Sequence, residues 1–359
     1  MTARRRSEPD RPSALVTGAS GMIGGEVAAQ LAAAGHRVRC LLRPSSGPPA
    51  VRHPNIEVLR ADLSDHVAVA AALRGVVRVF HVAGYLHAGA PFSAGEEYAP
   101  YRAANVDLTE RMLAASADAG VRRFVFASTT GVYRAGAASP IGEHSPLAPL
   151  SAYGRSKVEA EGVVREYGGR GLSYTIVRPS ATYGPGDRHF LPAALAMARM
   201  RRVPLVDGGR HLVDFGYVSD VARLMVQAAG APAADGATYN AATGNPQPLR
   251  ALFDVHAELT GQSSPAIVPV PAGLCRLLGP LLPAAVRLLA PGMSAMVTRD
   301  ALAYLSRDVF YDMSRSYRDF GFQPEIDFRA GLALVLAAGG LSTTGIPRSA
   351  NSRSADQNS

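Results

Sequence analysis

A short apolar strand that leads directly into a glycine-rich turn constrains the fold of this chain more than any other feature. The strand reads "ALVTG", and Gly18, Gly21 and Gly24 follow at intervals of three before a helix that ends near Gly35. Glycines at this spacing let the backbone turn and approach a pyrophosphate closely, and the N–H groups at the start of the helix bind the anion. Glycines that serve only to turn and cap a helix are the simpler alternative. The expected cofactor contacts in this turn are Gly18, Ser20, Gly21, Met22, Ile23 and Gly24.

Short strands alternate with helices of 10 to 20 residues through the first half of the chain. The expected helices cover residues 21–35, 65–75, 101–120 and 151–167, and the expected strands cover residues 14–18, 37–42, 56–63, 76–84, 122–129 and 172–179. This alternation predicts an α/β fold with a doubly wound, Rossmann-type parallel sheet and helices on both faces.

The regular alternation stops after Pro179, which divides the chain into two expected domains. We expect a dinucleotide-binding Rossmann domain at 13–178 and a smaller, mostly C-terminal substrate-binding lobe at 179–341. A strand near 238–242 is expected to return from this lobe to the main sheet. The composition of the ends predicts a disordered leader at 1–12 and a disordered tail at 342–359.

Charge, cysteines and apolar runs exclude several other classes of protein. The net charge of +8 is spread along the chain without a nucleic-acid reader motif, so we expect no nucleic-acid partner and a phosphorylated small molecule instead. Cys40 and Cys275 form neither a disulfide framework nor a metal-ligand spacing, so we expect no metal and a reducing, cytoplasmic location. The most apolar late stretch, 277–286, is interrupted by Pro280 and Pro283. It is well short of the roughly 20 residues that a membrane-spanning helix needs, so we expect no membrane span.

The ends of the second and third strands indicate which dinucleotide is bound. An acidic residue after the second strand would bond the adenosine ribose hydroxyls, but this chain has Arg43 there, placed to meet a 2′-phosphate. We therefore expect NADP as the preferred cofactor, with NAD as the alternative if Arg43 is only a solvated strand end. Asp62 is placed either to bond the adenine amino group or to cap the next helix. Leu63 and Ala83, at the ends of the third and fourth strands, complete the expected cofactor contacts.

Lys157 is the only lysine among the 37 lysine and arginine residues, and it lies four residues after Tyr153 on an expected helix. Residues four apart share one face of a helix. A nearby cation favours the phenolate and would lower the pKa of the tyrosine, which is ordinarily near 10. A flexible amine can also bond ribose hydroxyls, a task for which a planar guanidinium is no substitute. The pair therefore predicts a general acid/base, with a chance surface lysine as the alternative.

Further short motifs carry a resemblance to a known superfamily over roughly residues 13–335. They are "TGASGMIG", "ADL", "HVAG", "AANVD", "FASTTGVY", "YGRSK", "RPSATYGPGD" and "VDFGYVSDVA". On these motifs the chain resembles the extended short-chain dehydrogenases/reductases of the NAD-dependent epimerase/dehydratase type, nearest to the hydroxysteroid-dehydrogenase and dihydroflavonol-reductase-like branch. The resemblance implies an NAD(P)-dependent oxidoreductase with a small-molecule substrate and, by default, a homodimer formed through the two long helices.

The resemblance also implies roles for individual residues. Tyr153 would exchange a proton with the substrate oxygen, and Lys157 would hold the nicotinamide ribose and lower the pKa of Tyr153. Thr129, three residues before the valine of "GVY", would hydrogen-bond the same substrate oxygen, with Ser128 as the fallback. Asn105 would hold the helix geometry and a water in the proton path. The implied contacts around the nicotinamide are Tyr153, Lys157 and Pro179.

Departures from the nucleotide-sugar members of this superfamily favour a ketone or alcohol substrate. Those members often carry Asn and Arg where this chain has Ala181 and Val213, so two polar contacts to a diphosphate are missing. Thr130 and Gly131 stand where a dehydratase would need acidic groups. We expect hydride transfer between a secondary alcohol and a ketone. The alternatives are a nucleotide-sugar epimerase with tightly bound NAD, in which other arginines compensate, and a noncatalytic NADP-sensing or scaffold protein.

The sequence defines the substrate side of the site less sharply. The apolar stretch at 272–293 predicts either a lid over a hydrophobic substrate or the ordinary core of the smaller lobe. His87, Tyr183 and His189 are candidates for lining the substrate pocket, and each is equally well explained as plain loop structure.

Overall fold

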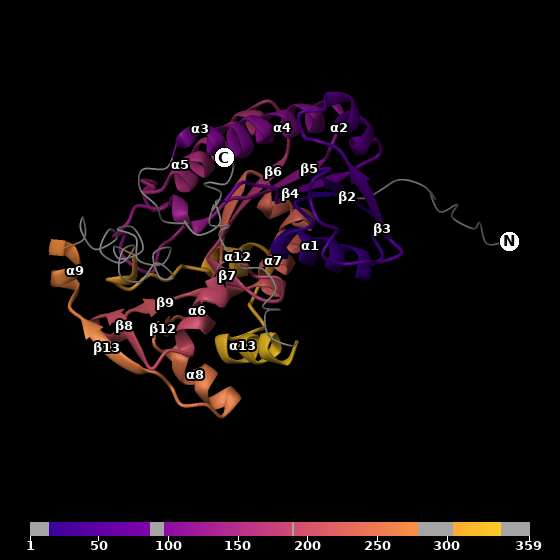
Figure 1. Cartoon of the computed structure of the whole chain (residues 1–359). Coiled ribbons are helices and arrows are strands. Elements are labelled where there is room, and N and C mark those ends of the chain that lie inside the picture. Colours follow the sequence, from indigo (N-terminus) through magenta and orange to yellow (C-terminus); the bar gives the residue numbers. More distant parts are fainter. Residues whose placement is uncertain (1–13, 87–96, 189, 279–303, 339–359) are drawn as a thin grey trace, which may run out of the picture.

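A seven-stranded parallel sheet forms the centre of the molecule (Figure 1). The computed structural model describes residues 14–86, 97–188, 190–278 and 304–338. The sheet has the strand order β11-β6-β5-β4-β1-β2-β3. Its strands are β1 (Ala14–Thr17), β2 (Val38–Leu42), β3 (Ile56–Arg60), β4 (Arg78–His81), β5 (Arg123–Ala127), β6 (Tyr174–Pro179) and β11 (Ala237–Ala241). This confirms the predicted Rossmann-type fold, while the expected leader and tail lie outside the described residues.

Helices cover both faces of this sheet, as Figure 1 shows. One face carries α1 (Met22–Ala33) and α7 (Val218–Gly230), and the other carries α2 (His66–Leu73), α4 (Leu108–Asp118) and α5 (Ala152–Gly169). The central strands are apolar almost throughout because both of their faces are buried; β1, for example, is buried at every position. The edge strand β3 is mostly exposed or half-buried.

The strand order places a ligand-binding position at the carboxyl ends of β1 and β4. β1 pairs with β2 on one side and with β4 on the other, so the order of strands reverses at this point. In open α/β sheets, ligands bind beyond the carboxyl ends of the strands at such a reversal. Thr17 ends β1 and His81 ends β4, and the two are partners in register. The glycine turn and the segment after β4 therefore meet at one place.

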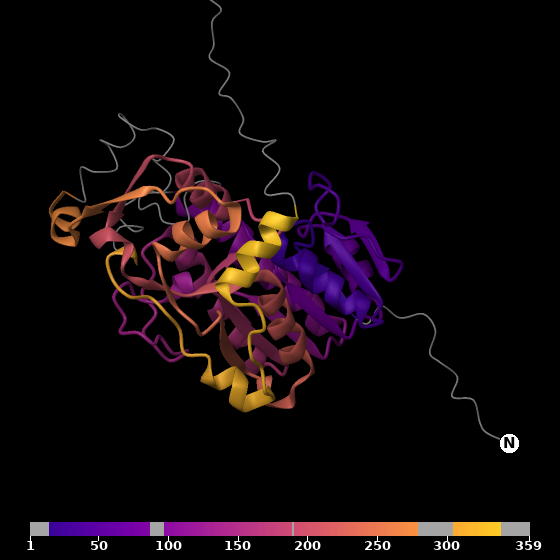
Figure 2. The ribbon, with the colours of Figure 1, turned by 90° about the horizontal axis from the view of Figure 1, so that it is seen from below.

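A smaller lobe is built mainly from the chain that follows β6. Its apolar core includes Phe215, Tyr217 and Phe328. Figure 2, which views the molecule from below, shows the yellow helix α13 beside the orange helix α8. Apart from α7 and β11, the strands and α-helices described after β6 are β7 (Ala181–Tyr183), α6 (Phe190–Ala198), β8 (Arg202–Val206), β9 (Leu212–Val213), β10 (Phe215–Tyr217), β12 (Gln247–Pro248), α8 (Ala251–Thr260), β13 (Ala266–Val270), α9 (Ala272–Leu278), α12 (Ser314–Phe320) and α13 (Phe328–Ala337).

Not all of the chain after Pro179 belongs to this lobe. α7 packs against α1 on the main sheet and leads directly into β11, which pairs with β6. The crossover from β6 to β11 therefore passes through the small lobe and then completes the Rossmann layer. The buried face of α7 packs against α1 and the sheet, which are distant in sequence, so its place follows from tertiary packing.

One candidate pocket residue is a core residue instead. Tyr183 is fully buried among the aromatic rings of the small lobe, and its hydroxyl donates a hydrogen bond to the carbonyl oxygen of Phe328 at 3.1 Å. His87, His189 and most of the apolar stretch 272–293 lie outside the described residues. Among the helices that the structure describes, none combines the length and the apolar character needed to cross a membrane.

Candidate active site

The glycine turn after β1 forms a cradle whose shape depends on the absence of side chains. Gly18 adopts a φ of +75°, and a Cβ there would lie 2.7 Å from the backbone nitrogen of Ala83. A Cβ on Gly24 would lie 2.5 Å from the carbonyl oxygen of Gly18, so glycine is what lets α1 approach the turn. Gly21 caps α1 and offers no side-chain acceptor to the N–H groups of the first turn. The turn therefore fits a pyrophosphate held at the start of α1.

The loop after β2 presents Arg43 to solvent. Arg60, the last residue of β3, donates from Nη1 to the carbonyl oxygens of Arg43 and Ser46, at 3.3 and 2.8 Å. These bonds shape the loop and leave the side chain of Arg43 exposed, where an anion can reach it. Sequence analysis did not identify Arg60, because its partners are carbonyl groups in a loop 14 to 17 residues away.

Asp62 forms a turn of its own and does not cap the next helix. Its Oδ1 accepts hydrogen bonds from the N–H and the hydroxyl of Ser64, at 2.8 and 2.6 Å. Asp65 caps α2 instead, by accepting a hydrogen bond from the N–H of Ala68. The bonds from Ser64, with a smaller contribution from the charge of Arg43, hold the pKa of Asp62 below its usual range. The capping alternative is therefore wrong, and the contact with adenine stays a prediction.

The remaining cofactor candidates at strand ends differ in what they expose. Leu63 is only 7% exposed, and its side chain packs in the apolar cluster that includes residues of α2 and α4. The N–H of Ala83 donates to the hydroxyl of Thr17 at 3.2 Å, which holds the end of β4 against the glycine turn. Pro179 ends β6 as the register partner of Ala241.

A buried histidine connects the ends of β1 and β4 to the helix that follows. Nδ1 of His81 lies 2.9 Å from the hydroxyl of Thr17, and Nε2 lies 3.1 Å from the hydroxyl of Thr109. Thr109 donates its own proton to the carbonyl oxygen of Asn105, so the proton of the imidazole must be on Nε2. Burial lowers the pKa of His81 to about 3, so the ring is neutral. Sequence analysis did not identify this role, although the residue lies in the motif "HVAG".

Asn105 is buried at a distortion of the long helix that the sequence predicts as continuous. The structure divides that helix into α3 (Tyr98–Arg102), a π-helical turn (Ala103–Asp107) and α4. The side-chain amide of Asn105 brackets Tyr85: Oδ1 accepts from its N–H at 2.6 Å, and Nδ2 donates to its carbonyl oxygen at 3.0 Å. Nδ2 also donates to the hydroxyl of Ser156 at 2.9 Å. Asn105 therefore ties the segment after β4 to α5 and is not an amide on the helix surface.

Lys157 is buried beside Asn105 and contacts the end of β5. Its side chain is almost inaccessible, and Nζ donates to the carbonyl oxygen of Ala127 at 2.9 Å. A Cβ on Gly84 would lie 3.2 Å from Nζ of Lys157 and 3.3 Å from Oδ1 of Asn105, so the glycine of "HVAG" leaves room for both groups. Burial lowers the pKa of Lys157 to about 8, because an ammonium loses hydration in the interior.

Tyr153 differs from the expectation in the direction of its pKa shift. Burial raises its pKa to about 12, whereas a dominant effect of the lysine would lower it. The reason is that Nζ of Lys157 is held at Ala127 and lies 5.9 Å from the centre of the tyrosine ring, so the loss of hydration by the phenolate dominates. Tyr153 is therefore protonated at neutral pH, which is the state that a proton donor requires.

The two hydroxyls after β5 point to different partners. Thr129 is half-buried, and its Oγ1 accepts a hydrogen bond from the N–H of Gly131 at 3.1 Å as the cap of a short 3-10 helix (Thr130–Val132). Ser128 is buried and donates to the carboxylate of Glu161 at 2.6 Å. Because the proton of Ser128 is already engaged in a buried contact, the geometry favours Thr129 over this fallback.

Thr130, where a dehydratase would carry an acid, joins a cluster of hydroxyl groups. The hydroxyls of Tyr304 and Tyr311 are hydrogen-bonded to each other, and each also interacts with the side chain of Thr130. Burial raises the pKa of both tyrosines. Within the described residues, no group of three or more His, Cys, Asp or Glu side chains is arranged to hold a metal ion. The side chains described above offer the site hydroxyl groups and one amine.

Comparison with known proteins connects this geometry to a family. The model of the NAD dependent epimerase/dehydratase family matches residues 14–242. The chain is 29% identical, over 90% of its length and 96% of the relative's, to a 4-hydroxy-2-methyl-3-oxo-4-farnesyl-3,4-dihydroquinoline-1-oxide ketoreductase of Stigmatella aurantiaca. It is 30% identical, over 90% of its length and 98% of the relative's, to a 2-alkyl-3-oxoalkanoate reductase of Stenotrophomonas maltophilia.

Solved structures show the same likeness. MoeE5 in complex with UDP-glucuronic acid and NAD superposes with a TM-score of 0.70 at 28% identity, covering 90% of this chain and 97% of that chain. The similar proteins thus include both reductases and a protein bound to a nucleotide sugar.

Proposed function

The chain belongs to the NAD-dependent epimerase/dehydratase family, and on that premise we propose that it is an NADP-preferring reductase that interconverts a ketone and a secondary alcohol. As a member of the extended short-chain dehydrogenases/reductases, it is an NAD(P)-dependent oxidoreductase with a nicotinamide cofactor and a small-molecule substrate. The observation that carries the finer proposal is the half-buried Tyr153, whose ring centre lies 5.9 Å from Nζ of Lys157 and whose pKa is raised by loss of hydration, so that it stays protonated.

In the proposed reaction each of these residues has one task. The bound nicotinamide supplies the hydride for the carbonyl carbon, or accepts it in the reverse direction. Tyr153 donates its hydroxyl proton to the carbonyl oxygen, and Thr129 donates a hydrogen bond to the same oxygen. The ammonium of Lys157 bonds the nicotinamide ribose, and Asn105 holds the segment after β4 that borders the site. The glycine cradle and Arg43 bind the pyrophosphate and the 2′-phosphate.

Two residues on the substrate side support a ketone over a nucleotide sugar. Val213, at the position where many nucleotide-sugar members carry an arginine, is 6% exposed and packs in the apolar core of the small lobe. The next residue, Asp214, is buried and accepts hydrogen bonds from the hydroxyl and N–H of Thr243, at 2.6 and 3.1 Å. Neither side chain is available to a diphosphate. The names of the two reductases agree with this proposal, and the likeness to MoeE5 keeps the epimerase as the rival.

The state of the cofactor in the purified protein separates these two functions. An epimerase must retain its reduced cofactor until the hydride returns, whereas a reductase exchanges it at each turnover. When the purified protein is denatured and the released material is analysed by mass spectrometry, we expect little nicotinamide cofactor. In a separate titration, we expect cofactor-free protein to bind NADPH reversibly. NADPH oxidation should then follow the addition of a 2-alkyl-3-oxoalkanoate or another 3-oxo compound. Stoichiometric retained NAD(H), with no oxidation of NADPH by any ketone, would support the epimerase instead.

Replacing Arg43 with alanine should weaken NADPH binding much more than NADH binding. A hydrogen-bonded charge pair contributes about 1.5–3 kcal/mol, so the dissociation constant for NADPH should rise about 10- to 100-fold. That for NADH should barely change, because NADH has no 2′-phosphate. Arg122→Ala is the matched control. Arg122 is exposed and directly precedes β5, so it lies at the amino-terminal ends of the strands, away from the carboxyl ends where the cofactor is expected. Equal effects of Arg43→Ala on both nucleotides would remove the reason for preferring NADP.

A further inference from the structure

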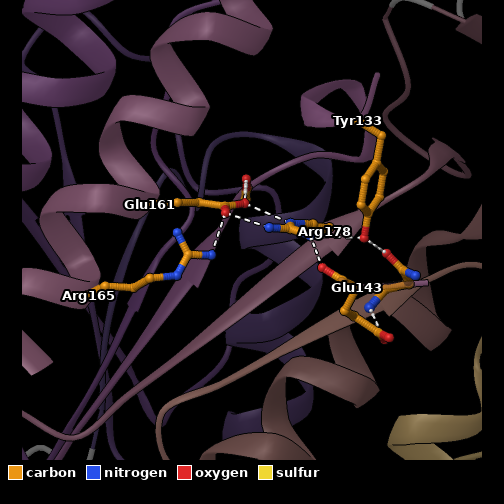
Figure 3. Close-up of polar contacts among 7 residues, drawn as sticks. Tyr133, Glu143, Glu161, Arg165 and Arg178 are labelled. Carbon is orange, nitrogen blue, oxygen red and sulfur yellow. Dashed lines mark hydrogen bonds and ion pairs between the residues drawn. The ribbon is translucent and has the colours of Figure 1, made fainter. Parts of the chain in front are cut away.

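A buried ion pair between Glu161 and Arg178 lies at the centre of a hydrogen-bonded cluster (Figure 3). The guanidinium donates to both carboxylate oxygens, from Nε to Oε1 at 2.8 Å and from Nη2 to Oε2 at 2.7 Å. The side chain of Glu161 is 0% exposed and that of Arg178 is 2% exposed. The third nitrogen, Nη1, donates to the hydroxyl of Tyr133 at 3.0 Å and to the carbonyl oxygen of Glu143 at 2.9 Å. The guanidinium thus has partners on three sides.

This pair connects three elements that carry the proposed active-site residues. On α5, Glu161 lies four residues, or about one turn, after Lys157. Ser128, whose hydroxyl donates to Glu161 at 2.6 Å, immediately precedes Thr129. Arg178 is the second-last residue of β6. The ends of β5 and β6 are therefore held against α5 within one turn of Lys157.

Stability alone does not account for such a pair. Removing two charges from water is costly, and apolar side chains of similar volume often stabilise a core as well as a buried ion pair does. What a bidentate guanidinium–carboxylate contact supplies in addition is a defined direction and distance. Here it defines how α5 sits against the ends of β5 and β6.

We propose that Glu161 and Arg178 are positioning residues, which set the placement of Lys157 relative to Thr129 and provide a negative charge one helical turn from the amine of Lys157. The proposal rests on the proposed function for its catalytic consequence. Its structural part, the control of the lysine by the ion pair, does not depend on any substrate.

Glu161 is the charged group that opposes the effect of burial on Lys157, and it is itself paired with Arg178 and, at 2.8 Å, with Arg165. Burial lowers the pKa of the amine to about 8, and the negative charge of Glu161 acts in the opposite direction. From β4, the imidazole of His81 faces the amine but is neutral. Tyr153, on the same helix, is protonated. β5 contributes two uncharged groups, the carbonyl oxygen of Ala127 and the ring of Phe126, whose centre lies 4.8 Å from Nζ. An opposite charge within several ångströms shifts a pKa by about 1–3 units, so loss of this carboxylate should lower the pKa of Lys157 by on the order of one unit.

Because Lys157 is the only lysine in the chain, its titration can be followed without interference from other lysines. Protein grown with lysine labelled with ¹³C at Cε should give one lysine side-chain signal, whose chemical shift reports the protonation of Nζ. We expect Glu161→Gln to titrate about one pH unit below the unmodified protein. Glu166→Gln is the matched control, because it removes a carboxylate from an exposed ion pair on the same helix and should leave the pKa of Lys157 unchanged.

A second variant protects the test against misfolding. Glu161→Gln leaves the charge of Arg178 buried without its partner, which can prevent folding. The double variant Glu161→Leu with Arg178→Met removes both charges with apolar side chains and should fold. Its lysine signal should also move to lower pH, but by less than in Glu161→Gln, because the positive charge of Arg178 is removed as well. A folded double variant whose lysine titrates as in the unmodified protein would overturn the proposal.

The catalytic consequence is read separately from the lysine signal. Misplacement of reacting groups by about 1 Å costs up to about 100-fold in rate, so kcat of the folded double variant should fall about 10- to 100-fold. The pH at which kcat declines should fall together with the lysine pKa. If the unmodified protein reduces no ketone, the proposed function is contradicted. The lysine titration still tests the structural part of the proposal, because it needs no substrate. If the folded double variant has the same kcat and the same pH profile as the unmodified protein, the positioning role is contradicted and the proposed function is not.

Discussion

Replacing Tyr153 with phenylalanine should lower kcat by about 100- to 10,000-fold, the usual contribution of a positioned acid or base, while NADPH binding remains nearly unchanged. The substitution removes only the hydroxyl that donates the proton. Lys157 keeps its place because its amine is bonded to the carbonyl oxygen of Ala127 at 2.9 Å and not to the phenol. Steady-state oxidation of NADPH with a ketone measures the first quantity, and a fluorescence titration of NADPH measures the second.

Tyr167→Phe is the matched control for this prediction. It makes the same chemical change on the same helix, but Tyr167 packs in the apolar cluster on the face of the sheet. Its kcat should equal that of the unmodified protein. If Tyr153→Phe turns over as fast as the control, another group supplies the proton and the mechanism is wrong. If instead the unmodified protein and both variants are all inactive, the result favours the scaffold alternative.

Replacing Gly24 with alanine should weaken both the fold and cofactor binding. The added Cβ would lie 2.5 Å from the carbonyl oxygen and 2.7 Å from the carbonyl carbon of Gly18. Backbone atoms cannot turn away as a side chain can, so α1 must shift from the turn. Overpacking of this kind costs about 1–3 kcal/mol of the free energy of unfolding. Loss of one hydrogen bond to the pyrophosphate would weaken NADPH binding about 10- to 100-fold.

Gly162→Ala should have the opposite effect on stability. Gly162 lies within α5, and a Cβ there would meet no heavy atom within 4 Å. Alanine in a helix interior is favoured over glycine by up to about 1 kcal/mol, so the free energy of unfolding should increase. Urea denaturation of both variants measures the difference. A Gly24→Ala protein that is as stable as Gly162→Ala and binds NADPH normally would mean that the cradle does not need its third glycine.

The parts of the fold that the sequence predicted correctly depend on short-range patterns. The strand, glycine turn and helix at residues 14–33 are formed by neighbours in the chain, and the predicted alternation became the seven-stranded sheet. The helical spacing of Tyr153 and Lys157 is likewise local, since both lie on α5. The π-helical turn at Asn105 was not predicted, because the helix opens there to let the amide bracket Tyr85, 20 residues earlier.

The electrostatics of the site required the folded structure. The expected fall in the pKa of Tyr153 was wrong, because its direction depends on burial, and burial depends on elements that are distant in sequence. The motif favoured Thr129 over Ser128, and the structure adds a physical reason, because the hydroxyl of Ser128 is already bonded to the buried Glu161. The neutral state of His81 follows from its burial. The position of its ring proton follows from hydroxyl partners 64 and 28 residues away.

The sequence by itself determined the type of sheet, the glycine cradle and the identity of the lysine–tyrosine pair. Backbone geometry decides these features within a few residues: a turn needs glycine where φ is positive, and four residues span one helical turn. Tertiary structure alone decided which groups are charged and where they are held. The ion pair of Glu161 and Arg178 joins residues 17 apart, and the bond from Tyr133 to Asn240 joins residues 107 apart. The energies of such contacts depend on burial away from water, and burial is produced by elements that are distant in sequence, so no short stretch of the chain predicts it.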